Sequence, residues 1–193
     1  MKKIMFNDRY GLTQAVIEGR KTMAMMLINI KSTSDVQVRI FAGYVQIIGR
    51  SGDVCAEKKL SYKVGEVVAV AQRYQDIFDY SNCVNPYAWE DDDKPSGWTN
   101  KMLTKAELMP HQIRITGIKC ERLQDISEED CMKEGILGDV EYDKYEVYGL
   151  FGNSDDGFDT PREAFASLID KVSGRGTWKR NPWVVAYEFE LVK

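Results

Sequence analysis

The chain has no long hydrophobic run. Its apolar stretches stay well below the roughly 18 residues that a membrane-spanning helix requires. The start, MKKIMFNDRYG, carries two lysines, but its apolar segment is too short for a signal peptide. We therefore expect a cytoplasmic protein with no membrane partner.

Histidine and cysteine are also scarce. The four cysteines have neither the spacing of a zinc site nor that of a redox motif, so reduced thiols are expected. The single histidine, His111, directly precedes a predicted strand and has no neighbours that suggest a catalytic triad. The aspartates of 152-GNSDDGFD-159 lack the spacing and the final glutamate of a calcium loop. With no phosphate-binding or dinucleotide glycine motif either, we expect no metal and no cofactor.

The net charge of −4 argues against a general nucleic-acid coat protein, which needs many phosphate contacts. It does not exclude a local basic site. The acidic run 90-EDDDK-94 is typical of a solvated loop.

The pattern of the chain predicts a mixture of strands and short helices without a βαβ rhythm. Helices are expected over 7–18, 126–136 and 160–174, strands over 23–30, 67–72, 112–123 and 183–192, and a hairpin over 36–48. Residues 75–110 and 137–159 are expected to form long loops. The sequence predicts one α+β domain over 1–193. About five or six strands would curl into a small β-barrel, with two or three short helices and two loop insertions.

Two of the helices have clear start signals. Thr160 precedes Pro161 and Glu163, which is typical of an N-cap, a first-turn proline and a capping box. Ser127 stands in the equivalent position before the other helix. Gly174 is expected to end the later helix.

Several motifs follow one another in a recognisable order. They are G-R-K-T at 19–22, K-x-G-E-V-V at 63–68, E-R-L-Q-D-I-S-E-E-D at 121–130, A-F-x-x-L-I-D at 164–170, W-x-x-N-P-W-V at 178–184 and Y-E-F-E at 187–190. In this order they resemble the ASCH family of the PUA-like β-barrel superfamily, particularly the longer members found in bacteriophages and prophages. The resemblance covers about 1–26, 60–74 and 112–193.

This resemblance implies a cleft beside the first helix, lined by a G-x-K-x-x-T-x-R motif. Family members are thought to bind RNA or nucleotide-like ligands, and some short members hydrolyse acetylated cytidine with a lysine, a threonine and a glutamate. Gly19 and Lys21 match the motif, and the acidic position falls on Glu134. Ala24 replaces the threonine and offers no hydroxyl nucleophile, while Met26 replaces the arginine and cannot hold a phosphate.

Two basic groups are candidate binding residues. Arg20 and Lys21 follow a predicted helix end, where cations are favourable, so each either caps the helix or contacts a ligand. In 174-GRGTWKRNPW-183, cations alternate with tryptophans that either stack on bases or pack against the barrel. Arg73 and Arg122 flank strands and reach either the cleft or the surface. The predicted ligand-binding set is Arg20, Lys21, Arg73, Glu134, Trp178, Lys179 and Arg180, with Lys21 and Glu134 as candidate catalytic groups.

Three hypotheses about function follow. The first is a protein that binds RNA or a nucleoside in a cationic cleft. The second is an amidohydrolase-type enzyme on modified nucleosides, in which Lys21 or Glu134 activates water. The third is a phage accessory or adaptor protein that binds a protein partner through the aromatic 75–110 loop. The aromatic residues of that loop are Phe78, Tyr80, Tyr87, Trp89 and Trp98.

Overall fold

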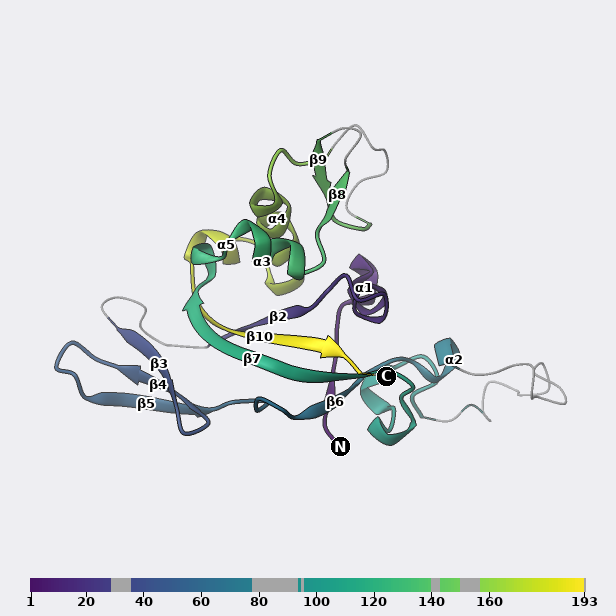
Figure 1. Ribbon diagram of the computed structural model, residues 1–193, viewed down its shortest axis with the longest axis horizontal. Helices are drawn as coiled ribbons and strands as arrows, with labels where there is room; N and C mark the ends of the chain where they lie inside the picture. Colours follow the sequence, from purple (N-terminus) through teal and green to yellow (C-terminus); the bar gives the residue numbers. More distant parts are fainter. Residues whose placement is uncertain (29–35, 78–93, 95, 140–142, 150–156, 193) are drawn as a thin grey trace, which may run out of the picture.

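A computed structural model describes residues 1–28, 36–77, 94, 96–139, 143–149 and 157–192 (Figure 1). Its largest sheet has five strands, which run in the order β1 (Lys3–Ile4), β6 (Val67–Val70), β7 (Gln112–Arg122), β10 (Trp183–Leu191) and β2 (Met23–Leu27). β1 is parallel to β6, and the other neighbours are antiparallel. β7 and β10 are the two longest strands of this sheet and pair with each other. The shorter strands β6 and β2 pair with their outer edges.

In β10, the alternating apolar residues Val185, Tyr187, Phe189 and Leu191 do not share one buried face. Val184, Val185, Ala186 and Tyr187 are all buried, which means that both faces of the strand are covered there. A bulge between Glu188 and Phe189 then shifts the register, and Leu191 is exposed. Because other parts of the protein cover both faces of this strand, its buried residues do not alternate with exposed ones.

A second sheet consists of β3 (Gln37–Phe41), β4 (Tyr44–Ile48) and β5 (Val54–Lys59) and projects from one end of the main sheet (Figure 1). The predicted hairpin is confirmed: Ala42 and Gly43, with φ of 50° and 83°, form its turn. β5 was not predicted. All of its residues are exposed and it lacks a hydrophobic alternation, so its sequence carries no strand signal.

The helices follow the predicted capping signals. Asn7 accepts a hydrogen bond from the Arg9 backbone N–H, and the predicted first helix is divided at Gly11 into η1 (Asp8–Tyr10) and α1 (Leu12–Ile17). Ser127 caps α3 (Glu128–Lys133), and Thr160 caps α4 (Pro161–Ser173). A further helix, α5 (Thr177–Arg180), was not predicted. Figure 1 shows α3, α4 and α5 gathered on one side of β7 and β10.

The two predicted loops contain structure. Within 137–159, β8 (Leu137–Asp139) pairs with β9 (Lys144–Glu146), which corrects the prediction of a loop there. The region 75–110 begins within α2 (Tyr74–Ile77) and later forms the short helices η4 (Lys101–Leu103) and η5 (Ala106–Leu108). Most of its predicted aromatic cluster lies outside the described residues, although Trp98 is described and half-buried. η6 (Leu123–Asp125) links β7 to α3.

The α+β class is confirmed. The described strands belong to separate sheets of five, three and two strands, and no hydrogen bonding between the described strands closes any of these sheets into a barrel. None of the helices in the described ranges combines the length and the apolar character needed to cross a membrane.

Candidate functional site

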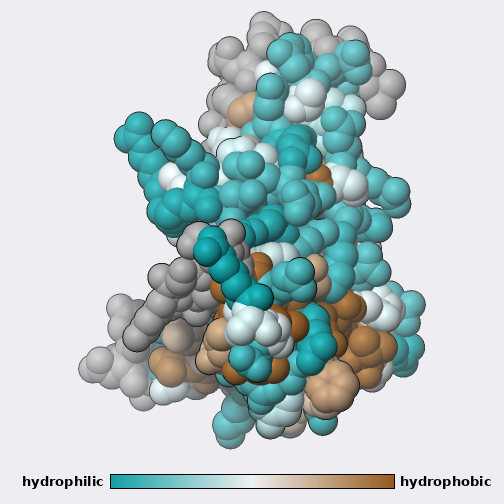
Figure 2. All heavy atoms as spheres, turned by 90° about the vertical axis from the view of Figure 1, so that its left-hand side faces the viewer, coloured by the Kyte–Doolittle hydropathy of each residue, from teal (hydrophilic) through white to brown (hydrophobic). Residues whose placement is uncertain are grey.

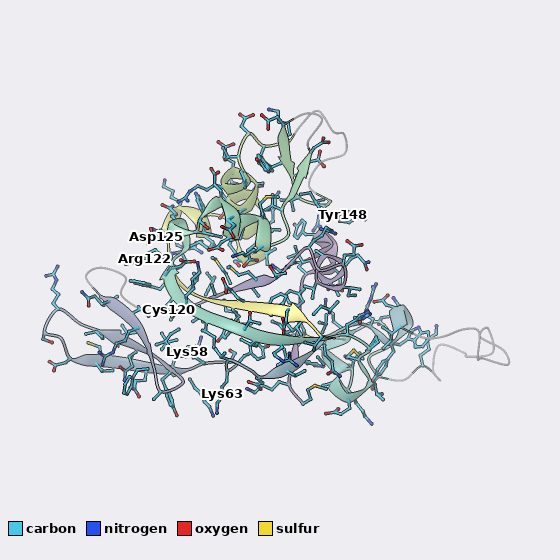
Figure 3. The ribbon with its side chains drawn as sticks, viewed as in Figure 1. Lys58, Lys63, Cys120, Arg122, Asp125 and Tyr148 are labelled. Carbon is cyan, nitrogen blue, oxygen red and sulfur yellow. The ribbon has the colours of Figure 1, made fainter. Side chains whose placement is uncertain are left out.

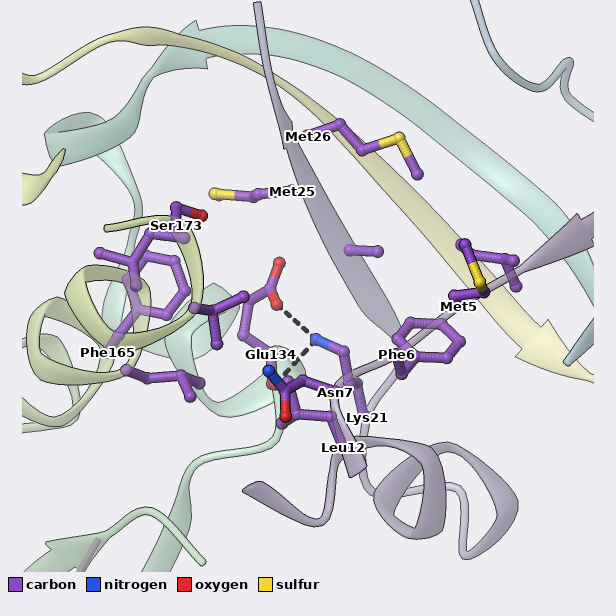
Figure 4. Close-up of a pocket in the computed structure, with 15 residues that line it drawn as sticks. Met5, Phe6, Asn7, Leu12, Lys21, Met25, Met26, Glu134, Phe165 and Ser173 are labelled. Carbon is purple, nitrogen blue, oxygen red and sulfur yellow. Dashed lines mark hydrogen bonds and ion pairs between the residues drawn. The ribbon is translucent and has the colours of Figure 1, made fainter. Parts of the chain in front are cut away.

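A pocket of about 160 Å³ lies between the N-terminal segment, β2 and α4 (Figure 4). Most of its wall is apolar. The lining residues are Ile4, Met5, Phe6, Asn7, Leu12, Lys21, Ala24, Met25, Met26, Glu134, Phe165, Leu168, Ile169, Val172 and Ser173. The pocket therefore offers an apolar enclosure with one charged pair, Lys21 and Glu134, in its wall.

The turn after α1 places Lys21 at this pocket. Gly19 has a φ of 74°, a left-handed conformation that ends the helix and that glycine adopts without strain. The Lys21 N–H then donates to the Ala15 carbonyl, at 2.9 Å, and the Thr22 N–H donates to the Lys133 carbonyl, also at 2.9 Å. These bonds attach the segment after α1 to the C-terminal end of α3, where Glu134 follows.

Lys21 and Glu134 form a buried ion pair. The Lys21 ammonium contacts carboxylate oxygen Oε2 of Glu134 and donates to the Glu134 backbone carbonyl at 2.8 Å. The two side chains are only 2% and 7% exposed. The ammonium also lies 5.8 Å from the centre of the Phe6 ring. Burial lowers the pKa of Lys21 below its ordinary value of 10.5, and the Glu134 carboxylate opposes that shift.

The second carboxylate oxygen of Glu134 is left without a partner. This atom, Oε1, is buried and has no hydrogen-bond donor among the residues that the structure describes. Figure 4 shows it pointing away from Lys21, on the side of the pocket where Met25 lies. A buried acceptor of this kind carries a desolvation cost that a bound donor would remove.

The predicted cationic cleft is replaced by a charge-compensated pocket. Lys21 faces a carboxylate rather than open solvent, and the thioether side chains of Met25 and Met26 form part of the apolar wall. Ala24 lines the pocket at the position where the resemblance expects a threonine. Ser173, at the end of α4, is the hydroxyl residue that the pocket contains instead, and no sequence motif indicated it.

Two of the predicted basic residues lie away from this pocket. The Arg20 guanidinium pairs with Glu18, with Nε 2.8 Å from Oε2, on the exposed end of α1. Arg73 pairs with Asp76, at 2.7 Å, and lines a separate surface hollow together with Asp8 and Gln72. Neither residue lines the Lys21 pocket.

The predicted binding residues of α5 do not line the pocket. Trp178 packs behind the pocket wall, whereas Lys179 and Arg180 face solvent. The Trp178 ring contacts Phe165 edge-on, with centroids 6.1 Å apart, and Phe165 in turn lines the pocket. Lys179 and Arg180 are exposed, and Arg180 donates to the Thr177 hydroxyl at 2.8 Å. These residues therefore do not join Lys21 and Glu134 in one site.

Arg122 lies at the end of β7 near α5 (Figure 3). Its guanidinium stacks 4.7 Å from the centre of the Trp183 ring and donates to the Asn181 carbonyl at 3.1 Å. It is part of the packing between β7 and the start of β10, and it does not line the pocket.

No binding motif of the sequence indicated several of the pocket residues. Phe165, Leu168 and Ile169 belong to the apolar stripe of α4 and form part of the pocket wall. Phe6 and Leu12 also belong to the wall. A hydrophobic pattern shows which face of a helix is inward, but not whether that face meets protein or an open pocket.

The described residues contain no group of three or more histidine, cysteine or acidic side chains placed to hold a metal. Comparisons of the chain with protein-family models, with curated proteins and with solved structures found no match.

Proposed function

We propose that the protein binds a nucleobase, free or as part of an RNA, in the pocket beside Lys21 and Glu134. The observation that supports this most directly is the buried, unpaired Oε1 atom of Glu134, a residue that lines an apolar pocket. Bases combine a flat, weakly polar ring with amino or ring N–H donors at the edge. Such a ligand would place its ring against the apolar wall and donate its N–H to the Oε1 atom of Glu134.

The size of the pocket suits one ring. Its volume of about 160 Å³ is close to that of apolar protein cavities of roughly 150 Å³ that bind benzene. Phe6, Phe165 and the methionines of β2 supply apolar contacts to such a ring. An N–H of the ligand would donate to Oε1, while Lys21 holds the other oxygen in place.

The same pair argues against a phosphate inside the pocket. The Lys21 charge is compensated at short range by Glu134, so the described residues that line the pocket leave no free cation to attract an anion. In this proposal the sugar and phosphate of a nucleotide remain outside, near the exposed Val172 side chain at the end of α4.

Membership of the ASCH family and curling of the strands into a PUA-like barrel belong to this proposal as well. Their support is the order of the sequence motifs and the meeting of Lys21 with Glu134, which are 113 positions apart in the chain. The motif positions taken by Ala24 and Met26 remain departures from the family pattern.

Calorimetric titration with the common nucleosides and with acetylated cytidine tests the proposal. We expect at least one to bind, with affinity reduced roughly tenfold or more by Glu134→Gln, because a carboxylate acceptor is lost. Ala24→Leu should also abolish binding by filling the pocket without changing its charge. Arg20→Ala is the matched control and should bind normally, because Arg20 lies outside the pocket. Absence of binding by every nucleoside contradicts the proposal.

A second candidate is hydrolysis of an acyl group from such a base. The lowered pKa of the buried Lys21 favours it, because shifted groups gather at catalytic sites. In this reaction Lys21 or Glu134 would activate a water molecule. Release of acetate from acetylated cytidine, lost in both Lys21→Ala and Glu134→Ala, is the expected result, and turnover unchanged in these variants excludes their roles.

A further inference from the structure

The second sheet presents a face that combines exposed aromatic and cationic side chains. Directly paired residues of neighbouring strands project from the same face of a sheet. Phe41 pairs with Tyr44, and Tyr44 pairs with Lys59, so these three side chains lie on one face at the turn end of the hairpin. We call this the outer face of the second sheet.

The opposite face is the packed one. Val45 and Ile47, which alternate with the outer-face residues of β4, are only 1% and 7% exposed. The inner face packs against the body of the protein, and among the described residues Arg39, Phe41, Tyr44 and Lys59 of the outer face are exposed, whereas Gln46 between them is 8% exposed. Figure 2, which views the molecule from this end, shows hydrophobic side chains at the surface among hydrophilic ones.

The two aromatic rings of the outer face are open. Phe41 is 59% and Tyr44 41% exposed. The Arg39 guanidinium lies 5.7 Å from the centre of the Phe41 ring and donates to Gln46, which donates to Glu57. This side-chain ladder holds Arg39 beside Phe41, so a cation and an aromatic ring are fixed next to each other.

A cationic hollow adjoins the aromatic pair. Lys2, Lys59 and Lys63 line it next to Gly43 of the hairpin turn, and its volume is about 400 Å³. Glu66, the one acidic side chain among the described residues that line it, already pairs with Lys2 at 2.9 Å and accepts from the Lys63 backbone N–H. Within the described ranges, neither the Lys59 nor the Lys63 ammonium forms a salt bridge, although the nearby Lys63 charge helps to lower the pKa of Glu66. Lys63, which lines this hollow, lies at the bottom of the molecule as it is drawn in Figure 3.

We propose that the outer face and this hollow bind a single-stranded nucleic acid. Bases would stack on Phe41 and Tyr44, and the phosphates between them would pair with Lys59 and Lys63. An acidic peptide would use the lysines but would leave two exposed rings without a role. The local excess of cations is notable because the whole chain carries a net charge of −4.

This surface is separate from the Lys21 pocket. In Figure 1 the second sheet and the helices that border the pocket lie on opposite sides of β7 and β10. Binding of a strand here therefore does not depend on the proposed function of the pocket, and either one can fail without the other.

Fluorescence anisotropy with short labelled oligouridine and oligothymidine tests the proposal in the full chain. The Phe41→Ala/Tyr44→Ala variant should bind about tenfold or more weakly, because each stacked base contributes strongly to affinity. Lys59→Gln/Lys63→Gln should reduce the slope of log affinity against log salt by about 1.4, at roughly 0.7 for each phosphate that no longer pairs with a lysine. All four positions are exposed, so melting temperatures should stay close to that of the native protein.

Two control variants show whether any loss of binding is specific to this surface. Lys179→Gln/Arg180→Gln removes the same charge from exposed positions on α5 and should leave binding unchanged. In the Ala24→Leu background, where the pocket is filled, the second-sheet variants should still weaken oligonucleotide binding by the same factor, which separates this proposal from the one above. The proposal is overturned if neither oligonucleotide binds, or if the α5 control weakens binding as much as the second-sheet variants. It is also overturned if polyglutamate binds as tightly as the oligonucleotides and the aromatic variant has no effect.

Discussion

Lysines in two regions of this protein have opposite environments. Lys21, in the pocket, is 2% exposed and is held by the carboxylate and the carbonyl of Glu134. Lys59 and Lys63, beside the second sheet, are exposed and form no salt bridge within the described part of the chain. A sequence motif had indicated the first of these as a ligand-binding cation, yet the exposed pair is better placed to meet an anion.

The difference follows from desolvation. Transferring an ammonium from water into the protein interior costs several kcal/mol or more unless a counter-charge compensates it. A buried lysine is therefore found with its partner, and that partner reduces its attraction for other anions. An exposed lysine keeps its hydration shell and its electrostatic attraction for anions, so it can exchange bound water for a phosphate. Basic residues in a motif thus indicate a site, while burial decides what the site recognises.

Removing the buried cation should have the largest effect on stability. We expect Lys21→Met to lower the free energy of unfolding by about 3–5 kcal/mol, because Glu134 would keep a buried charge without a partner. Urea denaturation measures the loss, and Lys63→Met, at an exposed lysine, should change it by less than about 0.5 kcal/mol.

Replacing the whole pair tests the explanation. The Lys21→Met/Glu134→Leu double variant should recover most of the stability lost in the single variant, because no unpaired charge remains. A double variant as unstable as Lys21→Met would show that poorer packing, rather than the uncompensated carboxylate, causes the effect.

The cysteines of the two regions should differ in reactivity. Cys131 in α3 is buried, and burial raises the pKa of its thiol to about 12, whereas Cys55 in β5 is exposed. In a protein with serine at positions 83 and 120, we expect Cys131 to react roughly a hundredfold more slowly than Cys55 with a disulfide reagent. The two rates should converge in urea, where both thiols are open to water. Equal rates in the native protein would mean that α3 opens readily.

The two faces of the second sheet offer a smaller contrast. Val45→Ala, on the inner face, should lower the free energy of unfolding by about 1.5–2 kcal/mol through the loss of two buried methyl groups. Val54→Ala, in the exposed β5, should change it by less than about 0.5 kcal/mol. Urea denaturation compares them. Equal and small effects would indicate that the second sheet does not unfold together with the main body.

Alkaline pH should reveal the smallest of these effects. Burial raises the pKa of Tyr62 from 10.0 to about 12, and its hydroxyl donates to the Lys3 carbonyl. Between pH 10 and about 12, Tyr62 loses its phenolic proton in the unfolded chain but keeps it in the folded protein. This contribution to stability is therefore complete below pH 10 and is lost as the pH rises towards about 12.

Tyr62→Phe should flatten the fall of stability over that pH range, as measured by urea denaturation. Tyr44→Phe is the matched control, because the exposed Tyr44 hydroxyl meets water in both states. An identical flattening in both variants would count against a special role for the buried hydroxyl.

The helices were largely predictable because their signals are local. Thr160 and Ser127 cap α4 and α3 through bonds to N–H groups three residues later, and the φ of Gly174, 100°, ends α4. The hairpin turn at Ala42 and Gly43 was predictable for the same reason. β5 and the β8–β9 pair were not, because their pairing satisfies backbone groups without a hydrophobic alternation in the sequence.

By itself the sequence determined the α+β class, the limits of its two capped helices and the proximity of Lys21 to a helix end. Those features depend on residues a few positions apart, whose preferences act in any fold. The tertiary structure alone decided that Lys21 is buried against Glu134, that methionines line its pocket, and that the exposed cations gather beside the second sheet. The reason is that charge compensation and desolvation depend on distances between residues that are far apart in the chain, and only the packed fold sets those distances.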